Sequence, residues 1–189
     1  MKGFYPRTVT VCLVIAVGIA FSLSGWRLEA WEAMLPLFDW METTVFGRIG
    51  QTWGAAFAVV QAFHLLGLAL LGGAVLLADG RLLGWWFTGT GEQILEAQSH
   101  TLFRWALILL VITGIFMACG VANKIYYLPV FWFKMLALGI GVAFAWGIRR
   151  PWVQQLDGAG CATTKLVGAA SIMVWFTVAA TGRWIGFSG

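Results

Sequence analysis

The sequence predicts an all-α integral membrane protein, built as a four-helix transmembrane bundle with an added N-terminal transmembrane helix and an interfacial helix. Of its 189 residues, 60% are hydrophobic and 11% are charged, whereas soluble domains carry about 25% charged residues. The mean hydropathy is +0.84. Apolar runs long enough to cross a bilayer recur along the chain, with polar loops between them.

The first element, residues 1–25, is predicted to be a transmembrane anchor. Residues 8–24 are apolar over about one crossing, and Lys2 and Arg7 precede them. A basic start and an apolar core also suit a signal peptide. Because no Ala-x-Ala cleavage site follows, we expect a retained helix.

The second element, residues 26–52, mixes aromatic residues with acids. An aromatic face opposite an acidic face is typical of a helix that lies in the membrane interface. We predict a periplasmic amphipathic segment, which Pro36 divides in two, packed on the bundle rather than on anionic lipid.

Residues 53–189 are predicted to form the bundle, with residues 79–103 as a polar inner loop. The TGTG stretch in that loop lacks the GK[ST] of a phosphate-binding loop. We find no internal repeat, which disfavours a transporter. The four predicted spans are residues 53–78, 104–122, 130–147 and 166–181.

Loop charges predict the orientation, because Lys and Arg accumulate on the cytoplasmic side. An N-terminus inside places more of them inside than outside, so we expect a multi-pass protein of a bacterial inner membrane with its C-terminus in the periplasm. The net charge of +4 therefore needs no nucleic-acid partner. The inner set is Lys2, Arg7, Arg81, Arg104, Arg149, Arg150 and Lys165, and the outer set is Arg27, Arg48, Lys124 and Arg183.

The three cysteines, Cys12, Cys119 and Cys161, lie in separate segments without CxxC or Cys/His spacing. Neither a disulfide framework nor a zinc site is expected. We predict free thiols.

His64 is the most informative residue of the sequence. It lies about 16 Å along the second predicted helix, near the middle of a hydrocarbon core about 30 Å thick. Intramembrane ionisable groups mark functional sites by default, so His64 is a candidate metal or haem ligand. The alternative is a histidine that hydrogen-bonds a hydroxyl or carbonyl of a neighbouring helix.

Three further residues could complete such a site. Met173 is expected at a similar depth, and His with Met is a known haem ligand pair; copper could use the same atoms but normally takes more ligands. Lys134 lies about two turns inside its span, where it could face a haem propionate or a quinone oxygen, or snorkel outwards. Arg183 could serve the same anion or anchor its helix at the interface.

The remaining polar residues suggest no catalytic centre, and whether the chain is an enzyme stays open. Asp79 and Arg81 are expected to form an ion pair at the end of a helix. No two carboxylates share a predicted span, which argues against a proton relay. His100 is expected to be a solvated loop residue, so it cannot share one haem with His64.

Several phrases in order resemble an uncharacterised family of bacterial four-span membrane proteins, a domain-of-unknown-function family. They are LPLFDWMETTVFGRIGQ, FHLLGLALLGGAVLLADGRLLG, RWALILLVITGIF, YYLPVFWFKMLALGIG and AATGRWIGF. The resemblance covers roughly residues 35–187. It implies a four-span bundle, to which residues 8–24 are an addition.

The same order of helices is distantly similar to haem-binding bundles, namely the HemJ-type protoporphyrinogen oxidases and the CopD-like copper-resistance proteins. That similarity implies site roles for His64, Arg81 and Lys134. The HemJ type also has further histidines, whereas this chain has only His100 besides His64. The similarity therefore implies a haem-type pocket rather than protoporphyrinogen oxidation.

The leading functional hypothesis is a membrane-embedded subunit that binds b-type haem through His64 and transfers electrons to or from quinone or a periplasmic redox partner. Haem b, with quinone as a second cofactor, is the expected ligand. The alternative is a cofactor-free accessory subunit of a larger membrane complex. In both cases we expect the lipid bilayer and a membrane protein partner, or a second copy of the chain, as contacts.

Overall fold

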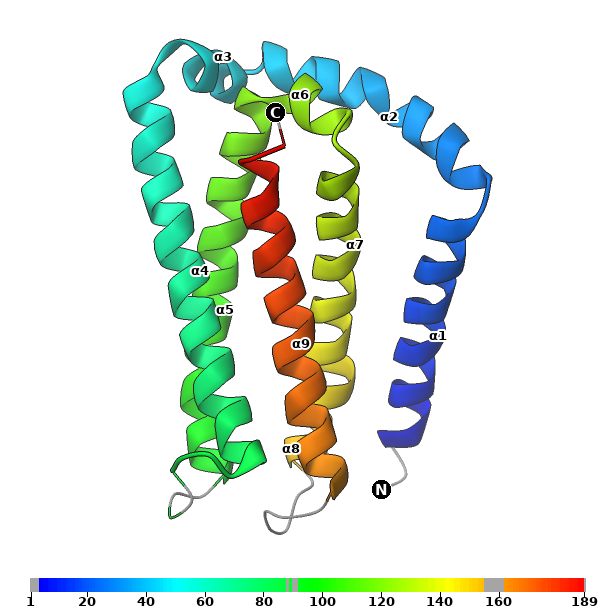
Figure 1. Cartoon of the computed structure of the whole chain (residues 1–189), viewed down its shortest axis with the longest axis vertical. Coiled ribbons are helices and arrows are strands. Elements are labelled where there is room, and N and C mark those ends of the chain that lie inside the picture. Colours follow the sequence, from blue (N-terminus) through cyan, green and yellow to red (C-terminus); the bar gives the residue numbers. More distant parts are fainter. Residues whose placement is uncertain (1–3, 88, 90–91, 155–161, 189) are drawn as a thin grey trace.

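The computed structural model of the chain describes residues 4–87, 89, 92–154 and 162–188, and every element in these ranges is a helix. Four helical runs are long and apolar enough to cross a membrane (Figure 1). They are α4 (Gly54–Leu83), α5 (Glu92–Gly120), the run Pro129–Gln154, and α9 (Ala162–Ile185). The four-span bundle of the sequence analysis is confirmed to this extent.

The third of these runs contains a change of helix type. It begins as α7 (Pro129–Phe144), continues as the π-helix η1 (Ala145–Arg149) and ends as α8 (Arg150–Gln154). Pro129 suits the first helical position, because the N–H that proline lacks would have no helical partner there. A π turn inside a long helix widens the spiral and often occurs at functional sites.

The four runs pack most closely in one half of the bundle. α4 contacts α5 and α9, and α9 contacts α7. The core joins Leu71 and Ala74 on α4 to Phe103 on α5 and Trp175 on α9. Every buried residue of α4 lies at or beyond Gly67, so the half of α4 that precedes it has no buried residue.

A second layer of helices covers the opposite end of the bundle. α2 (Trp26–Thr43) and α3 (Val45–Thr52) run across the ends of α5 and α7, next to the short α6 (Ala122–Tyr126) (Figure 1). A second core cluster forms between α2 and α6. Its buried members are Phe38, Ala122, Ile125 and Tyr126.

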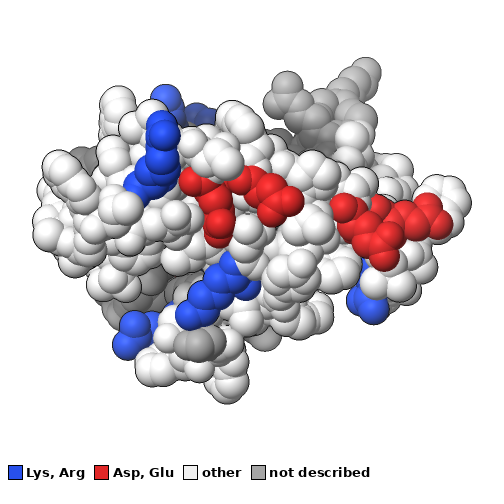
Figure 2. Space-filling model, turned by 90° about the horizontal axis from the view of Figure 1, so that it is seen from above, with Lys and Arg blue, Asp and Glu red and all other residues white. Residues whose placement is uncertain are grey.

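The outward face of this layer carries acids. Figure 2, viewed from that end, shows acidic side chains in two groups with basic side chains beside them. α2 supplies Glu29, Glu32 and Asp39, all exposed, while Glu42 turns inwards to accept hydrogen bonds from Asn123. The predicted amphipathic segment is therefore a cap on the bundle.

The N-terminal helix α1 (Phe4–Leu23) meets α2 at a bend of 86°. It touches α7 and η1, where Val11 packs on Gly147. If α1 and α2 are counted together as one bent span, up to five spans are possible by length and composition among the described residues.

Several predicted boundaries differ from the structure. Pro36 lies inside a continuous α2, and the break comes at Thr44. α4 continues to Leu83, and α5 begins at Glu92, inside the predicted loop. Polar residues at these helix ends face the bundle, so polarity alone was a misleading loop signal. The predictions on Lys2, on Cys161 and on part of TGTG lie outside the described residues.

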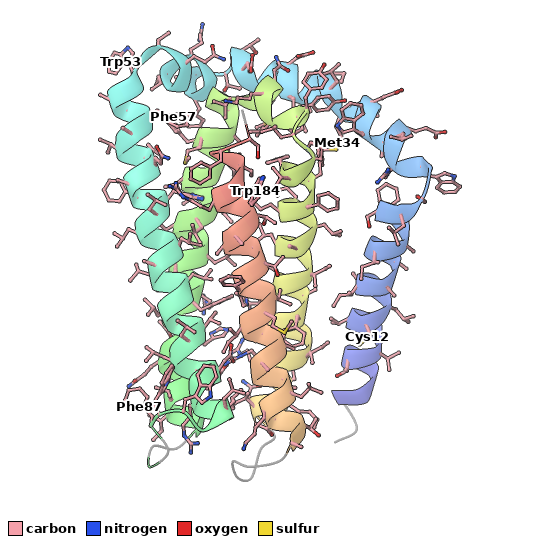
Figure 3. The ribbon with its side chains drawn as sticks, in the orientation of Figure 1. Cys12, Met34, Trp53, Phe57, Phe87 and Trp184 are labelled. Carbon is pink, nitrogen blue, oxygen red and sulfur yellow. The ribbon has the colours of Figure 1, made fainter. Side chains whose placement is uncertain are left out.

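Aromatic side chains lie near both ends of the bundle. Figure 3 labels Trp53 at the start of α4, Phe87 beyond its far end, and Trp184 near the end of α9. All three are mostly exposed. Aromatic belts of this kind are typical of the two membrane interfaces.

Candidate functional site

His64 binds a hydroxyl on the neighbouring helix. Its Nδ1 lies 2.8 Å from the Oγ1 of Thr113 on α5. The ring also sits against Gly114, where a Cβ would approach the His64 Cε1 to 3.4 Å. The half-buried imidazole is therefore fixed by one side of α5.

The Thr113 hydroxyl decides which ring nitrogen of His64 carries the proton. It donates its single proton to the Leu109 carbonyl, at 2.6 Å. The Thr113 oxygen must then accept from His64 Nδ1–H. In the neutral ring the lone pair is left on Nε2. This arrangement, with one nitrogen anchored and the other a free base, is that of histidines that bind metals.

Lys134 and Arg183 lie at the same half of the bundle as His64. Lys134 on α7 rests against α9, with its Nζ 3.5 Å from the Cβ position of Gly182. Its ammonium is within electrostatic range of His64. Arg183, the next residue of α9, is exposed and lies over the Phe187 ring at 4.7 Å. The structure thus places Lys134 within electrostatic range of His64 and puts Arg183 in the same half of the bundle.

The other two predicted site residues lie elsewhere. Met173 is 69% exposed on α9, so its thioether is not turned towards His64. Arg81 is in the last turn of α4 and buried. The 17 positions that separate it from His64 span about 26 Å of helix. Neither residue joins the histidine site.

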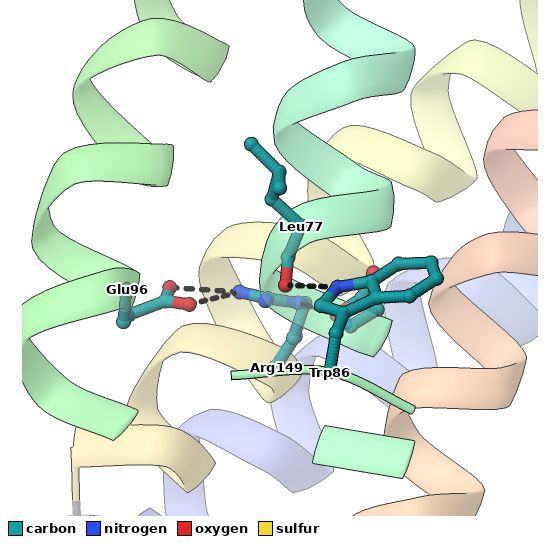
Figure 4. Close-up of polar contacts among 5 residues, drawn as sticks. Leu77, Trp86, Glu96 and Arg149 are labelled. Carbon is teal, nitrogen blue, oxygen red and sulfur yellow. Dashed lines mark hydrogen bonds and ion pairs between the residues drawn. The ribbon is translucent and has the colours of Figure 1, made fainter. Parts of the chain in front are cut away.

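A second polar site, which sequence reasoning missed, surrounds Arg149. Its Nε donates to Asp79 Oδ1 at 2.5 Å. Its Nη1 donates to both oxygens of Glu96 at 2.7 and 2.9 Å (Figure 4). All three side chains are at least nine-tenths enclosed. We expected Asp79 to pair with Arg81, but in the structure Asp79 pairs with Arg149.

Local structure explains how these three charges meet. Arg149 ends the π-helix η1, whose wider turn sets its direction, and α4 carries Asp79. On α5, Glu96, Ser99 and Phe103 are spaced three and four apart and therefore share one inward face. The signal was present in the sequence as this polar periodicity, which we interpreted as a loop.

His100 belongs to this second site and is not a solvated loop residue. It lies on α5, its ring packs edge-on against Trp146, and its Nε2 is buried without a protein partner. It borders a cavity of about 30 Å³ together with Glu96, Ser99, Arg149 and Ser171.

The inner end of α4 is closed by Trp86. Its indole N–H donates to the Leu77 carbonyl at 3.3 Å (Figure 4). The ring lies so close over Gly80 that any Cβ there would overlap it. Gly84, with φ of +80°, ends the helix in the left-handed conformation that glycine adopts freely and lets the chain turn back.

Across the described part of the chain, no three His, Cys, Asp or Glu side chains gather into a set that could hold a metal ion. Of the three cysteines, Cys12 and Cys119 are free thiols. A bare copper ion would find too few ligands at His64. A haem iron would not need them, because the porphyrin supplies four nitrogens.

Comparisons with known proteins add a family but no activity. Residues 37–188 match a family described as being of unknown function, DUF6644. A search of curated proteins and a search of solved structures each found no match.

Proposed function

Starting from the premise that the chain belongs to the DUF6644 family, which brings no activity with it, we propose that it is a membrane-embedded electron-transfer subunit whose His64 ligates a b-type haem. One observation carries the proposal. The Thr113 hydroxyl holds Nδ1–H of His64 and leaves Nε2 as a fixed free base inside an apolar helix. The same hydrogen bond to a hydroxyl of a neighbouring helix is what the cofactor-free alternative expects, so the haem proposal depends on Nε2.

The residues around His64 suit the polar edge of a haem. The Lys134 ammonium has no ion pair or hydrogen bond to the described residues and lies within electrostatic range of His64, so it would be available to a propionate. Arg183 at the end of α9 could serve a second carboxylate. The unburied half of α4, residues 54–66, offers apolar surface for a porphyrin face. Haem would supply one-electron chemistry there.

The proposal uses one protein ligand. Met173 is not included, because it is exposed to the outside of the bundle. Any further ligand would have to come from a partner chain. We also propose that the subunit exchanges electrons with a quinone or a periplasmic redox protein. Its membrane would be a bacterial inner membrane, with the N-terminus of the chain inside. This orientation puts His64 in the outer half of the membrane.

An optical spectrum of the purified chain, made under haem-replete conditions and reduced with dithionite, tests the proposal. We expect a Soret band and a reduced α-band. His64→Ala should lose both, while His100→Ala, the matched control, should keep them. Thr113→Val should retain haem but weaken its binding roughly 10–100-fold, as loss of an outer partner of a ligand does. A featureless spectrum, or full bands in His64→Ala, would refute it.

A second candidate function is that of a cofactor-free accessory subunit. The observation that favours it is at Gly72 and Gly73 on α4, where an added Cβ would meet nothing within 4 Å. Small residues without a neighbour inside the chain leave room for close approach of a partner helix. The same spectrum separates the two candidates, because only the first requires haem.

A further inference from the structure

The cavity beside Arg149 is lined by polar atoms that lack partners. Besides His100 Nε2, the unpartnered buried atoms include Arg149 Nη2 and Ser171 Oγ. These three atoms belong to residues that line the cavity. Asp79, at 0% exposed, lies behind this lining within hydrogen-bond reach of Ser171, and its Oδ2 has no other partner among the described residues.

Leaving these atoms bare would be costly. A buried donor or acceptor without a partner destabilises a fold, and the cost is larger for a charged group. A polar cavity holds a water once it offers about 10–15 Å³ and two to four polar contacts. The 30 Å³ here therefore has room for about two waters.

The donor and acceptor properties of the four atoms suit a chain of hydrogen bonds that could carry a proton. Arg149 Nη2 can only donate, Asp79 Oδ2 can only accept, and Ser171 Oγ can do both. His100 Nε2 accepts in one protonation state and donates in the other. Water between them can hand a proton from one end of the chain to the other.

We propose that this cavity is a hydrated proton-binding site, in which internal water shares one proton between the His100 imidazole and the Asp79 carboxylate. In one state His100 carries the proton on Nε2 and Asp79 is ionised. In the other, that proton has passed through water and the Ser171 hydroxyl to Asp79 Oδ2, and both groups are neutral. The Nε2–H bond of His100 breaks and an Oδ2–H bond forms on Asp79, no bond between two heavy atoms changes, and no other reactant is needed.

The charged groups facing the site come from three segments. Glu96 and Arg104 on α5, with Arg149 and Arg150 on the third run, act on His100. Arg149 and Glu96 also act on Asp79. The fixed Arg149 cation favours ionised Asp79, and burial favours neutral Asp79. Arg149 and burial therefore act in opposite directions on the Asp79 carboxyl.

The site is independent of the proposed haem. Asp79 lies 15 positions beyond His64 on α4, which is about 22 Å of helix. A chain without haem would keep the cavity, so failure of the haem proposal leaves this inference standing.

The test is a pH titration of the full chain, labelled with ¹⁵N-histidine and placed in lipid nanodiscs. The chain has two histidines, and His100→Gln identifies the signal of His100. We expect Asp79→Asn to move the His100 midpoint to lower pH by about one unit, because a nearby negative charge is lost. Asp39→Asn, the same change on exposed α2, should leave it in place.

Two further arms keep the test decisive. If Asp79→Asn fails to fold, Ala74→Val narrows the cavity without changing a charge, and we expect the midpoint to fall again as water is displaced. An infrared difference spectrum should show a protonated carboxyl band on acidification that Asp79→Asn removes. Three outcomes would overturn the proposal. They are an unchanged His100 midpoint in a folded Asp79→Asn or Ala74→Val variant, a carboxyl band that only Glu96→Gln removes, and a His100 midpoint that shifts with sodium chloride but not with choline chloride.

Discussion

Among single residues, Arg149 is the buried cation that pairs with two buried carboxylates. It is one cation for two carboxylates, all three enclosed in a helical bundle. A buried ion cluster contributes little net stability compared with apolar packing, but removing one member leaves the others charged and unpaired. Arg149 is therefore expected to be far less replaceable than a surface arginine.

This argument predicts the outcome of Arg149→Met. Two buried carboxylates lose their cation, and the free energy of unfolding should fall by about 3–5 kcal/mol. The measurement is unfolding of the purified chain in mixed micelles, followed by far-UV circular dichroism. Arg150→Met, at the adjacent and less buried position, is the control and should change stability little. Equal losses in both variants would contradict the assigned role of Arg149.

The sequence predicted His64 correctly as a polar residue within a span, because one ionisable group in an apolar run is conspicuous. It could not predict Thr113 as the partner, because threonine is common in helices and its hydroxyl often bonds its own backbone. Arg149 was missed for another reason. A basic residue at the end of an apolar run normally marks a membrane boundary. Only the carboxylates of α4 and α5 that pair with Arg149 show that Arg149 lies inside the bundle.

At the scale of helices, the apolar runs predicted four helices that are long and apolar enough to cross a membrane, but these helices extend beyond the predicted runs where polar residues turn inwards. The inner end of α4 is an example. We predicted that Asp79, Gly80 and Arg81 begin a loop, but they are buried residues of α4. Gly80 is needed there because the Trp86 indole covers it.

Gly80→Ala should therefore be harmful. The added methyl overlaps the indole and must displace it, and overpacking of this kind typically costs about 1–3 kcal/mol. Gly72→Ala on the same helix is the matched control, because a Cβ there meets nothing, and alanine is the better helix former. Thermal unfolding in detergent should show a lower midpoint for Gly80→Ala and an unchanged or higher one for Gly72→Ala. The reverse order would show that Trp86 does not pack over α4 as described.

At the scale of the whole molecule, the two ends of the bundle are held in different ways. The end that contains Asp79, Glu96 and Arg149 closes on charges and a polar cavity. The opposite end is covered by α2, which attaches to α6 through hydrogen bonds and stacked rings. This cap could not be predicted from residues 26–52 alone, because an amphipathic segment can lie on lipid or on protein with the same pattern.

Trp31 and Tyr126 make the attachment reciprocal. The Tyr126 hydroxyl donates to the Trp31 carbonyl at 2.8 Å, and the Trp31 indole N–H donates to the Tyr126 carbonyl at 3.2 Å. Their rings stack at 4.7 Å. Burial raises the pKa of the Tyr126 phenol above its usual range, so the hydroxyl remains a donor across neutral pH.

The raised pKa predicts how stability depends on alkaline pH. The unfolded phenol ionises near pH 10, and the folded phenol ionises higher, so unfolding between these values releases a proton. The stabilisation is complete below about pH 10 and is lost as pH rises through the folded pKa. Tyr126→Phe should lower the thermal midpoint by about 2–4 °C near pH 8, and it should also flatten the decline of that midpoint above pH 10.

Tyr127→Phe is the control for this experiment, because Tyr127 is the adjacent residue and is 62% exposed. It should keep both the midpoint and the alkaline decline of the parent chain. If Tyr126→Phe declined as steeply as the parent, the alkaline loss would arise elsewhere, and the cap would not depend on this phenol. If the thermal midpoint of Tyr126→Phe declined less steeply than that of the parent chain, one hydrogen bond between α2 and α6 would determine how strongly the cap is attached to the bundle. This attachment is next to the half of the bundle that contains His64.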